Sequence, residues 1–147
     1  MSIFPTTILL ATDGSEEAQL AATTAADLAQ KTNSELHVIT VGPDHPLYAY
    51  PEAPARFEDA LREQRHQAKE VLEQQVKRIE DAGGTVNDKH LRDGRADEEI
   101  VAVAEEIGAG LIVMGSRGHG RLRRALMGSV SEAVVRHAHC PVTIVRK

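Results

Sequence analysis

The residues best suited to chemistry lie between positions 110 and 131, where glycine, arginine and serine follow an apolar run. Residues 111–114 are Leu-Ile-Val-Met, a pattern typical of a parallel strand covered on both faces. Gly115, Gly118 and Gly120 then interrupt a cationic segment. Its cationic or partly cationic side chains are Arg117, His119, Arg121, Arg123 and Arg124.

The same stretch ends in a second small-residue pair, Gly128-Ser129, followed by an amphipathic run that predicts a helix over residues 130–138. Glycines expose backbone N–H groups, and the first turn of a helix favours negative charge. A buried strand, a cationic glycine loop and a helix start therefore predict a nucleotide-phosphate site. We interpret Arg121, Arg123 and Arg124 as a solvated face, from which one arginine reaches the γ-phosphate.

The glycine spacing differs from two common phosphate-binding motifs. A P-loop requires Lys followed by Ser or Thr after its last glycine, and no such pair follows Gly120. The pattern Gly-x-Gly-x-x-Gly fails as well, because Arg123 stands where the third glycine belongs. The stretch therefore carries neither of these two fingerprints.

Asp13, in the turn after a first apolar run over residues 8–11, has two interpretations that the sequence leaves open. Its carboxylate suits Mg²⁺, which takes one or two carboxylates together with phosphate oxygens. Asp is equally favoured as a helix N-cap, either with Glu16 or in competition with Ser15. The two roles do not exclude each other. Ser129 likewise has two interpretations, as a helix cap or as a phosphate ligand.

A second group, His137, His139 and Cys140, has the residue types of a zinc site. Histidines two residues apart on a helix point in different directions, and the sequence shows no fourth ligand near them. Histidines close to a helix C-terminus also interact favourably with the helix dipole. We therefore expect no zinc at this group.

The elements that position these residues alternate between strand and helix along the whole chain. Expected strands cover residues 8–11, 36–41, 85–91, 111–114 and 142–145. Expected helices cover residues 18–29, 57–79, 96–107 and 130–138. The segment 42–54 contains four prolines, Tyr48 and Tyr50, and is a candidate flap whose tyrosines either stack on a base or anchor the loop.

This alternation predicts an α/β fold in which a parallel sheet has helices on both faces. Ligands of such sheets bind beyond the carboxyl ends of the strands, at the point where strand order reverses. Asp13 and Gly115 must then lie at the ends of neighbouring strands. Length allows one domain over residues 1–147.

Composition narrows the class of protein. The net charge of −5 argues against general nucleic-acid binding, although the arginines near Gly120 suit a small polyanion. A single cysteine excludes an intrachain disulfide and fits a reducing compartment. The N-terminus lacks the pattern of a signal peptide, and no apolar run is long enough to cross a membrane. We expect a cytoplasmic protein without membrane insertion.

The chain resembles the universal stress protein family, in its ATP-binding branch. That branch has glycine, two residues, glycine, nine residues, then glycine followed by Ser or Thr, and Gly115, Gly118, Gly128 and Ser129 fit this spacing without a gap. Residues 11–15, 113–116, 128–132 and 140–142 resemble other segments of the family, so the similarity covers nearly the whole chain. It implies an open five-stranded sheet of order 3-2-1-4-5, Rossmann-like and of the adenine nucleotide α-hydrolase type.

The resemblance also implies roles for individual residues. The backbone near Val41 would contact adenine, Asp13 would face the ribose and a phosphate-bound Mg²⁺, and Gly128 would donate to a phosphate. At Ala11, ATP-binding relatives often have proline, and the missing ring predicts a slightly looser turn and lower affinity. The full implied set is Ala11, Thr12, Asp13, Val41, Met114, Gly115, Arg117, Gly118, Gly128, Ser129 and Val130.

Three hypotheses for function remain. The favoured one is a stress-response module that binds ATP with Mg²⁺ and signals to an unidentified protein partner. The second is a slow ATPase or phosphotransferase, disfavoured because the sequence offers no convincing residue to orient an attacking water. The third is an interaction protein that has lost its nucleotide. The apolar strand Val142–Val145 invites edge pairing, and relatives dimerise through it, so we expect a homodimer.

Overall fold

The computed structural model describes residues 2–44, 55–116 and 127–147. Strands and helices alternate from the N-terminus to the C-terminus, as the sequence predicts. They are β1 (Thr7–Ala11), α1 (Glu16–Thr32), β2 (Glu35–Gly42), α2 (Ala55–Asp81), β3 (Asp88–Asp93), α3 (Ala96–Glu106), β4 (Leu111–Gly115), α4 (Ser129–His137) and β5 (Val142–Val145). Among the described residues, no helix is long and apolar enough to cross a membrane.

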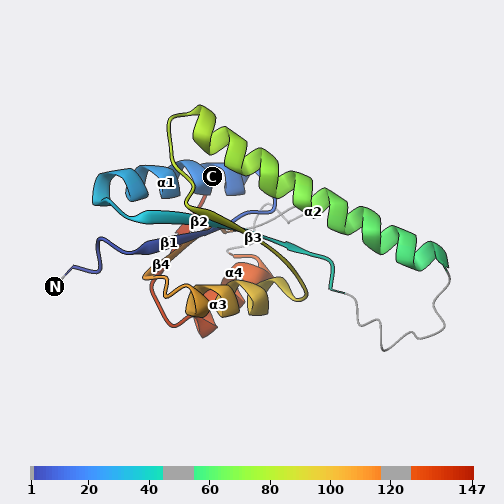
Figure 1. The fold of residues 1–147 in the computed structure, drawn as a ribbon. Coiled ribbons are helices and arrows are strands. Elements are labelled where there is room, and N and C mark those ends of the chain that lie inside the picture. Colours follow the sequence, from blue (N-terminus) through green and yellow to red (C-terminus); the bar gives the residue numbers. More distant parts are fainter. Residues whose placement is uncertain (1, 45–54, 117–126) are drawn as a thin grey trace.

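The strands form one parallel sheet in the order β3-β2-β1-β4-β5, which confirms the predicted topology. Helices α1 and α2 cover one face, and α3 and α4 cover the other (Figure 1). The chain returns from the β3 edge through α3 to β4, on the far side of β1. Strand order therefore reverses between β1 and β4, where the sheet opens a place for a ligand.

Each strand sends alternate side chains into two separate cores. Ile8 and Leu10 of β1 pack under α1 and α2, whereas Leu9 packs under α3 and α4. Helix α1 approaches the sheet through a face of small residues, as the sequence predicts. Its buried alanines are Ala18, Ala21, Ala22, Ala25 and Ala29. Because these side chains are small, the backbone of α1 lies close to the sheet and close to Gly115 at the end of β4.

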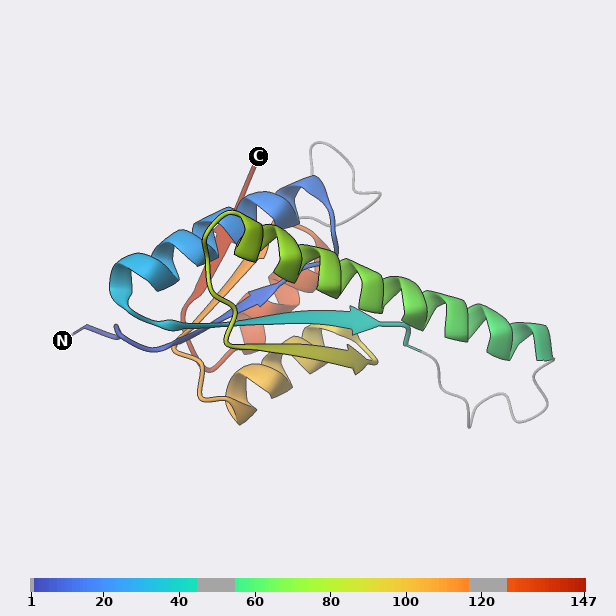
Figure 2. The same ribbon diagram turned by 45° about the horizontal axis from the view of Figure 1, so that its top comes forward.

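The third strand runs over Asp88–Asp93, so the predicted range 85–91 starts three residues too early. Asn87 explains the later start. Its side-chain Oδ1 accepts a hydrogen bond from the Leu36 N–H (2.8 Å), and its own N–H donates to the Leu36 carbonyl (2.8 Å). The segment before Asn87 lies outside the ladder, and β3 pairs with β2 only from Asp88 onward, at the edge of the sheet (Figure 2).

The structure decides between the two predicted caps of α1 and corrects the predicted cap of α4. Ser15 is the N-cap of α1, where its Oγ accepts from the Ala18 N–H (3.2 Å), so Asp13 does not cap this helix. Gly128 is the N-cap of α4, and Ser129 is the first residue inside the helix. Because the cap residue is glycine, it has no side chain that could accept a hydrogen bond from the first-turn N–H groups of α4.

Candidate functional site

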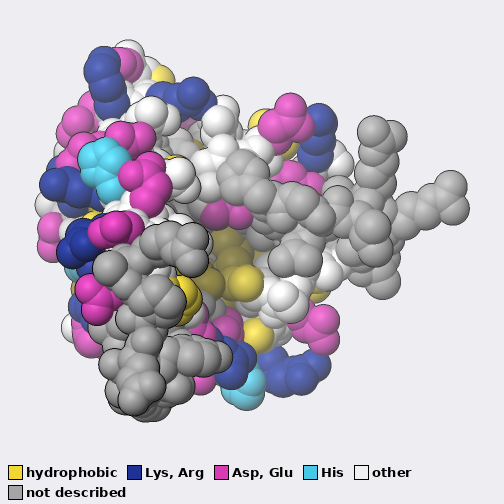
Figure 3. Space-filling view, turned by 90° about the vertical axis from the view of Figure 1, so that its right-hand side faces the viewer, with side chains coloured by type: hydrophobic (Ala, Val, Ile, Leu, Met, Phe, Trp, Pro, Cys, Tyr) yellow, Lys and Arg dark blue, Asp and Glu magenta, His cyan; other side chains and the backbone are white. Residues whose placement is uncertain are grey.

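A cavity of ≈ 270 Å³ lies at the carboxyl ends of β1, β2 and β4, beside the first turns of α3 and α4. This volume is close to the lower end of the range for small-molecule sites, about 300–1,000 Å³. Viewed onto this end of the molecule, hydrophobic side chains form the floor of a hollow (Figure 3). Its lining is Ala11, Thr12, Asp13, Ser15, Ala18, Ile39, Val41, Ala96, Ile100, Met114, Gly115, Ser116, Gly128, Val130 and Ser131.

The fold brings most of the predicted site residues to this cavity. The predicted residues in its lining are Ala11, Thr12, Asp13, Val41, Met114, Gly115, Gly128 and Val130. Ser129 is exposed at the start of α4 and does not line the cavity. Arg117 and Gly118 lie outside the described residues, as do the other loop arginines and the two tyrosines of the predicted flap.

The end of β1 is fixed by hydrogen bonds that cross the sheet. The buried Thr12 hydroxyl donates to Oε1 of Gln75 on α2 (3.0 Å), and the Thr40 hydroxyl donates to the Thr12 carbonyl (3.1 Å). The Thr12 side chain is thus engaged with α2. Its contribution to the site is to hold the β1–α1 turn in place.

Asp13 is exposed at the cavity, where its Oδ1 accepts a hydrogen bond from the Ser15 N–H (2.9 Å). This contact closes the short turn between β1 and α1 and fixes the carboxylate at the N-terminus of α1. A carboxylate in this place suits a hard divalent cation, which prefers oxygen ligands. The chemistry of the donor therefore fits the predicted Mg²⁺.

Ser116, at the end of β4, joins three parts of the site. Its carbonyl accepts from the Gly128 N–H (2.7 Å) and from the Ser131 hydroxyl (2.6 Å), which holds the start of α4 against the strand end. Its own hydroxyl donates to the buried carboxylate of Glu17 on α1 (2.5 Å). Sequence reasoning missed Ser116, Ser131 and Glu17, although hydroxyls flanking the glycine loop were a visible signal.

Gly115 lies in close contact with helix α1. A Cβ at this position would lie 3.0 Å from Cβ of Glu17 and 3.2 Å from the backbone nitrogen of Ala18, which is tighter than ordinary van der Waals contact. A side chain here would push the helix and the strand apart by a few tenths of an ångström. Contact between strand and helix is therefore a structural reason for the first glycine of the spacing that suggests a phosphate loop.

The two sides of the cavity differ in polarity, which matches the two ends of a nucleotide. Ile39 and Val41 of β2 and Ile100 of α3 supply an apolar surface. The other side has Asp13 and the first turn of α4, whose N–H groups lack an intrahelical acceptor. A flat apolar ring fits the first side and an anion fits the second.

Of the two histidines near the end of α4, His139 makes a structural contact. His137 lies in the last turn of the helix, and the Nε2 of His139 donates to the Ala109 carbonyl (3.1 Å). Burial raises the pKa of the Cys140 thiol above its ordinary value. These observations describe a helix end packed on the α3–β4 turn.

Comparison with known proteins identifies the family. The model of the universal stress protein family matches residues 5–146. A universal stress protein of Methanocaldococcus jannaschii is 36% identical over 140 residues, which cover 95% of this chain and 81% of that protein. A putative universal stress protein of Staphylococcus epidermidis is 34% identical over 140 residues, covering 95% of this chain and 82% of that protein.

Solved structures agree with the family match. The universal stress protein UspA of Lactobacillus plantarum superposes with a TM-score of 0.82 at 26% identity, covering 99% of this chain and 100% of that one. A universal stress protein in complex with cAMP superposes with a TM-score of 0.67 at 26% identity, covering 97% of each chain. Because the family model matches residues 5–146 and the relatives are more than 30% identical over 140 residues, this chain belongs to the universal stress protein family.

Proposed function

We propose that this chain binds ATP, together with Mg²⁺, in the cavity at the carboxyl ends of β1, β2 and β4. The observation that supports the proposal most is the pairing, in one cavity, of an apolar wall on β2 with the uncapped first turn of α4. The related structure that contains cAMP shows that a family member with the same fold accepts an adenine nucleotide.

In this proposal each side of the cavity has a separate task. The adenine ring lies against Val41 and Ile39, where the end of β2 offers apolar contact. The phosphates lie towards the first turn of α4, which favours negative charge. Asp13 provides the protein ligand for Mg²⁺, and the nucleotide phosphates complete its coordination.

Hydrogen bonds of the fold preorganise the phosphate end. The Ser116 carbonyl holds the Gly128 N–H and the Ser131 hydroxyl, so the start of α4 needs no rearrangement relative to β4. The Gly128 N–H is therefore already donating within the protein. The remaining predicted donors, Ser129 and Val130, belong to the first turn of α4.

We propose a regulatory role for this nucleotide site. ATP occupancy would report the energy state of the cell to a protein partner, and any hydrolysis would be slow.

We further propose a cytoplasmic homodimer joined through β5, which lies at the edge of the sheet. Light scattering at micromolar concentration is expected to give twice the mass of one chain, and a single-chain mass would contradict the dimer.

The binding proposal is tested by calorimetric titration of the full chain with ATP, with and without Mg²⁺. Ala96→Leu, at the start of α3, places three extra carbons at the cavity and is expected to weaken ATP binding at least ~10-fold. Ala102→Leu is the matched control, since Ala102 is also half-buried on α3 but does not line the cavity. Equal ATP affinities in the two variants would contradict the site.

A further inference from the structure

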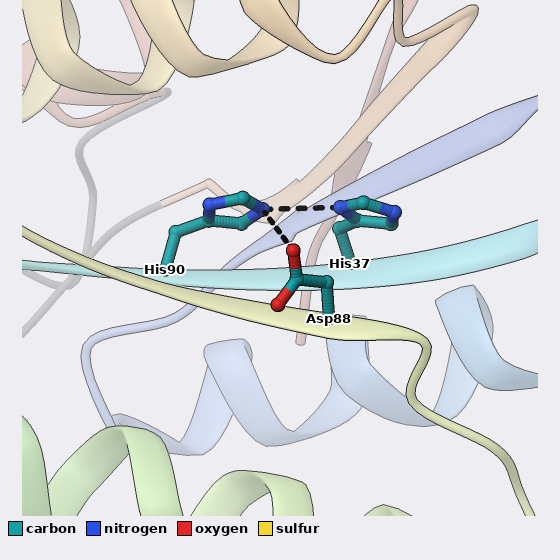
Figure 4. A group of neighbouring side chains, drawn as sticks. All are labelled: His37, Asp88 and His90. Carbon is teal, nitrogen blue, oxygen red and sulfur yellow. Dashed lines mark hydrogen bonds and ion pairs between the residues drawn. The ribbon is translucent and has the colours of Figure 1, made fainter.

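His37, Asp88 and His90 form a cluster on β2 and β3, at the edge of the sheet (Figure 4). His37 lies near the start of β2, and the other two residues lie in the first half of β3. None of the three lines the nucleotide cavity. Ile39, which does line the cavity, is two residues beyond His37, about 7 Å along an extended strand.

Strand register brings these three residues together from positions more than fifty residues apart. In the parallel β2–β3 ladder, His37 pairs with Asp88 and Ile39 pairs with His90. Side chains alternate between faces, so Asp88 and His90 point to one side of β3 and Leu91 points to the other, into the core under α1 and α2. The cluster therefore lies on the α3 face of the sheet.

The ligand atoms are close enough to share one ion. Nδ1 of His37 lies 3.0 Å from Nε2 of His90, and Oδ2 of Asp88 lies 4.0 Å from the same His90 nitrogen. All three ligand atoms lie within 4.8 Å of one another. Two nitrogens bound to one tetrahedral Zn²⁺ at about 2.0–2.1 Å would be separated by roughly 3.3 Å. The two imidazoles need to move apart by only a few tenths of an ångström.

The surroundings of the cluster also suit a metal. The two imidazole rings are nearly parallel, with centroids 5.3 Å apart, and the His90 side chain is only 14% exposed. Asp88 is 61% exposed, so its carboxylate has room to turn towards an ion. Arg92, the nearest cation on the same face of β3, is paired with Glu106 of α3 (2.6 Å). Its charge is thereby partly balanced.

We propose that His37, His90 and Asp88 bind a divalent transition-metal ion of the Zn²⁺ type, with solvent in the remaining position. Two imidazoles and one carboxylate form a ligand set that Zn²⁺ and Co²⁺ accept. The ion would join β3 to β2 and thereby stabilise the edge strand. The proposed metal ligands are not among the residues that line the nucleotide cavity, so the metal proposal does not rest on the nucleotide proposal.

The test is calorimetric titration of chelator-treated, nucleotide-free full chain with ZnCl₂, because ATP would itself bind the metal. We expect one Zn²⁺ per chain, an increase of the melting temperature, and a Co²⁺ complex with visible absorption bands. His37→Ala and His90→Ala are each expected to weaken Zn²⁺ binding by about 100-fold or more, since even outer partners of metal ligands account for about 10–100-fold.

Two further variants keep the test decisive if a histidine variant folds poorly. Asp88→Asn changes an exposed side chain and is expected to weaken binding about 10-fold without changing the metal-free melting temperature. His66→Ala removes an exposed histidine of α2 and is expected to leave binding unchanged. Absence of Zn²⁺ binding by the wild-type chain, or Zn²⁺ binding that survives the His37, His90 and Asp88 changes, would overturn the proposal.

Discussion

The two ends of the sheet present different kinds of site. At the carboxyl ends of β1, β2 and β4, small residues and the first turn of α4 leave a cavity lined largely by backbone and apolar side chains. Near the start of β2 and β3, two imidazoles and a carboxylate converge to within 4.8 Å of one another. The first arrangement suits a nucleotide and the second suits a metal ion.

The comparison shows that a site is easier to predict from sequence when its residues are local. The glycine loop and the start of α4 are contiguous in sequence, and the spacing of their glycines and serine predicts phosphate binding. The histidine cluster depends on the register of β2 against β3, which the range predicted for the third strand did not give. A pairing shifted by one residue would place His90 on the opposite face.

The largest expected effect concerns Gly115, where strand and helix are in direct contact. Gly115→Val should lower the free energy of unfolding by about 3 kcal/mol, because the new side chain overlaps the backbone of α1. Ala102→Val on the half-buried face of α3 is the control and should lose about 1 kcal/mol or less. Urea denaturation followed by circular dichroism measures both. Equal losses would show that Gly115 has no special packing role.

The second prediction tests whether the two ends are independent. Asp13→Asn should weaken Mg²⁺–ATP binding by about 10-fold and leave the Zn²⁺ affinity within about twofold of wild type. His37→Ala should weaken Zn²⁺ binding by about 100-fold or more and leave the Mg²⁺–ATP affinity within about twofold of wild type. Paired calorimetric titrations of both variants measure this, with Asp27→Asn, an exposed carboxylate on α1, as control. Loss of both activities in either variant would mean that the two regions are coupled.

A smaller effect is expected at Ser131, whose buried hydroxyl donates to the Ser116 carbonyl. Ser131→Ala should destabilise the fold by about 1 kcal/mol and weaken ATP binding, because the start of α4 then keeps one of its two hydrogen bonds to the Ser116 carbonyl, the one from the Gly128 N–H. Ser129→Ala, at an exposed position, is the matched control for stability. A Ser131 variant with unchanged ATP affinity would show that this bond does not preorganise the site.

The smallest predicted effect is a pH dependence at the histidine cluster in the metal-free chain. The folded-state pKa of His90 is lowered, so the unfolded chain binds the proton more readily. Stability from this group is therefore present above the unfolded pKa, about 6.5, and is lost as pH falls from there towards the folded pKa. His90→Gln should reduce the fall in melting temperature between pH 7.5 and pH 5.5. If the melting temperature of the variant fell as much as that of the wild type, the pH dependence would come from groups other than His90.

Most of the fold could be predicted from the sequence, because apolar runs and amphipathic periods fix strands and helices locally. The sheet order came from the family resemblance and is confirmed. The sequence left the cap of α1 open between Asp13 and Ser15, which are two residues apart and both favoured at N-caps, and the structure selects Ser15. The cap of α4 was placed one residue too late, at Ser129, because serine is favoured over glycine at N-caps. The contact between Glu17 and Ser116 could not be predicted, since it joins positions 99 residues apart.

The most direct test of the nucleotide site is an ATP titration, with Mg²⁺, of the isotope-labelled chain followed by amide chemical shifts. We predict saturable shifts at the amides of Ala11, Asp13, Val41 and Val130, with His37, Asp88 and His90 unaffected. Zn²⁺ added to nucleotide-free chain should give the opposite pattern. The absence of ATP-dependent shifts, or shifts concentrated away from the carboxyl ends of β1, β2 and β4, would contradict the proposed nucleotide site.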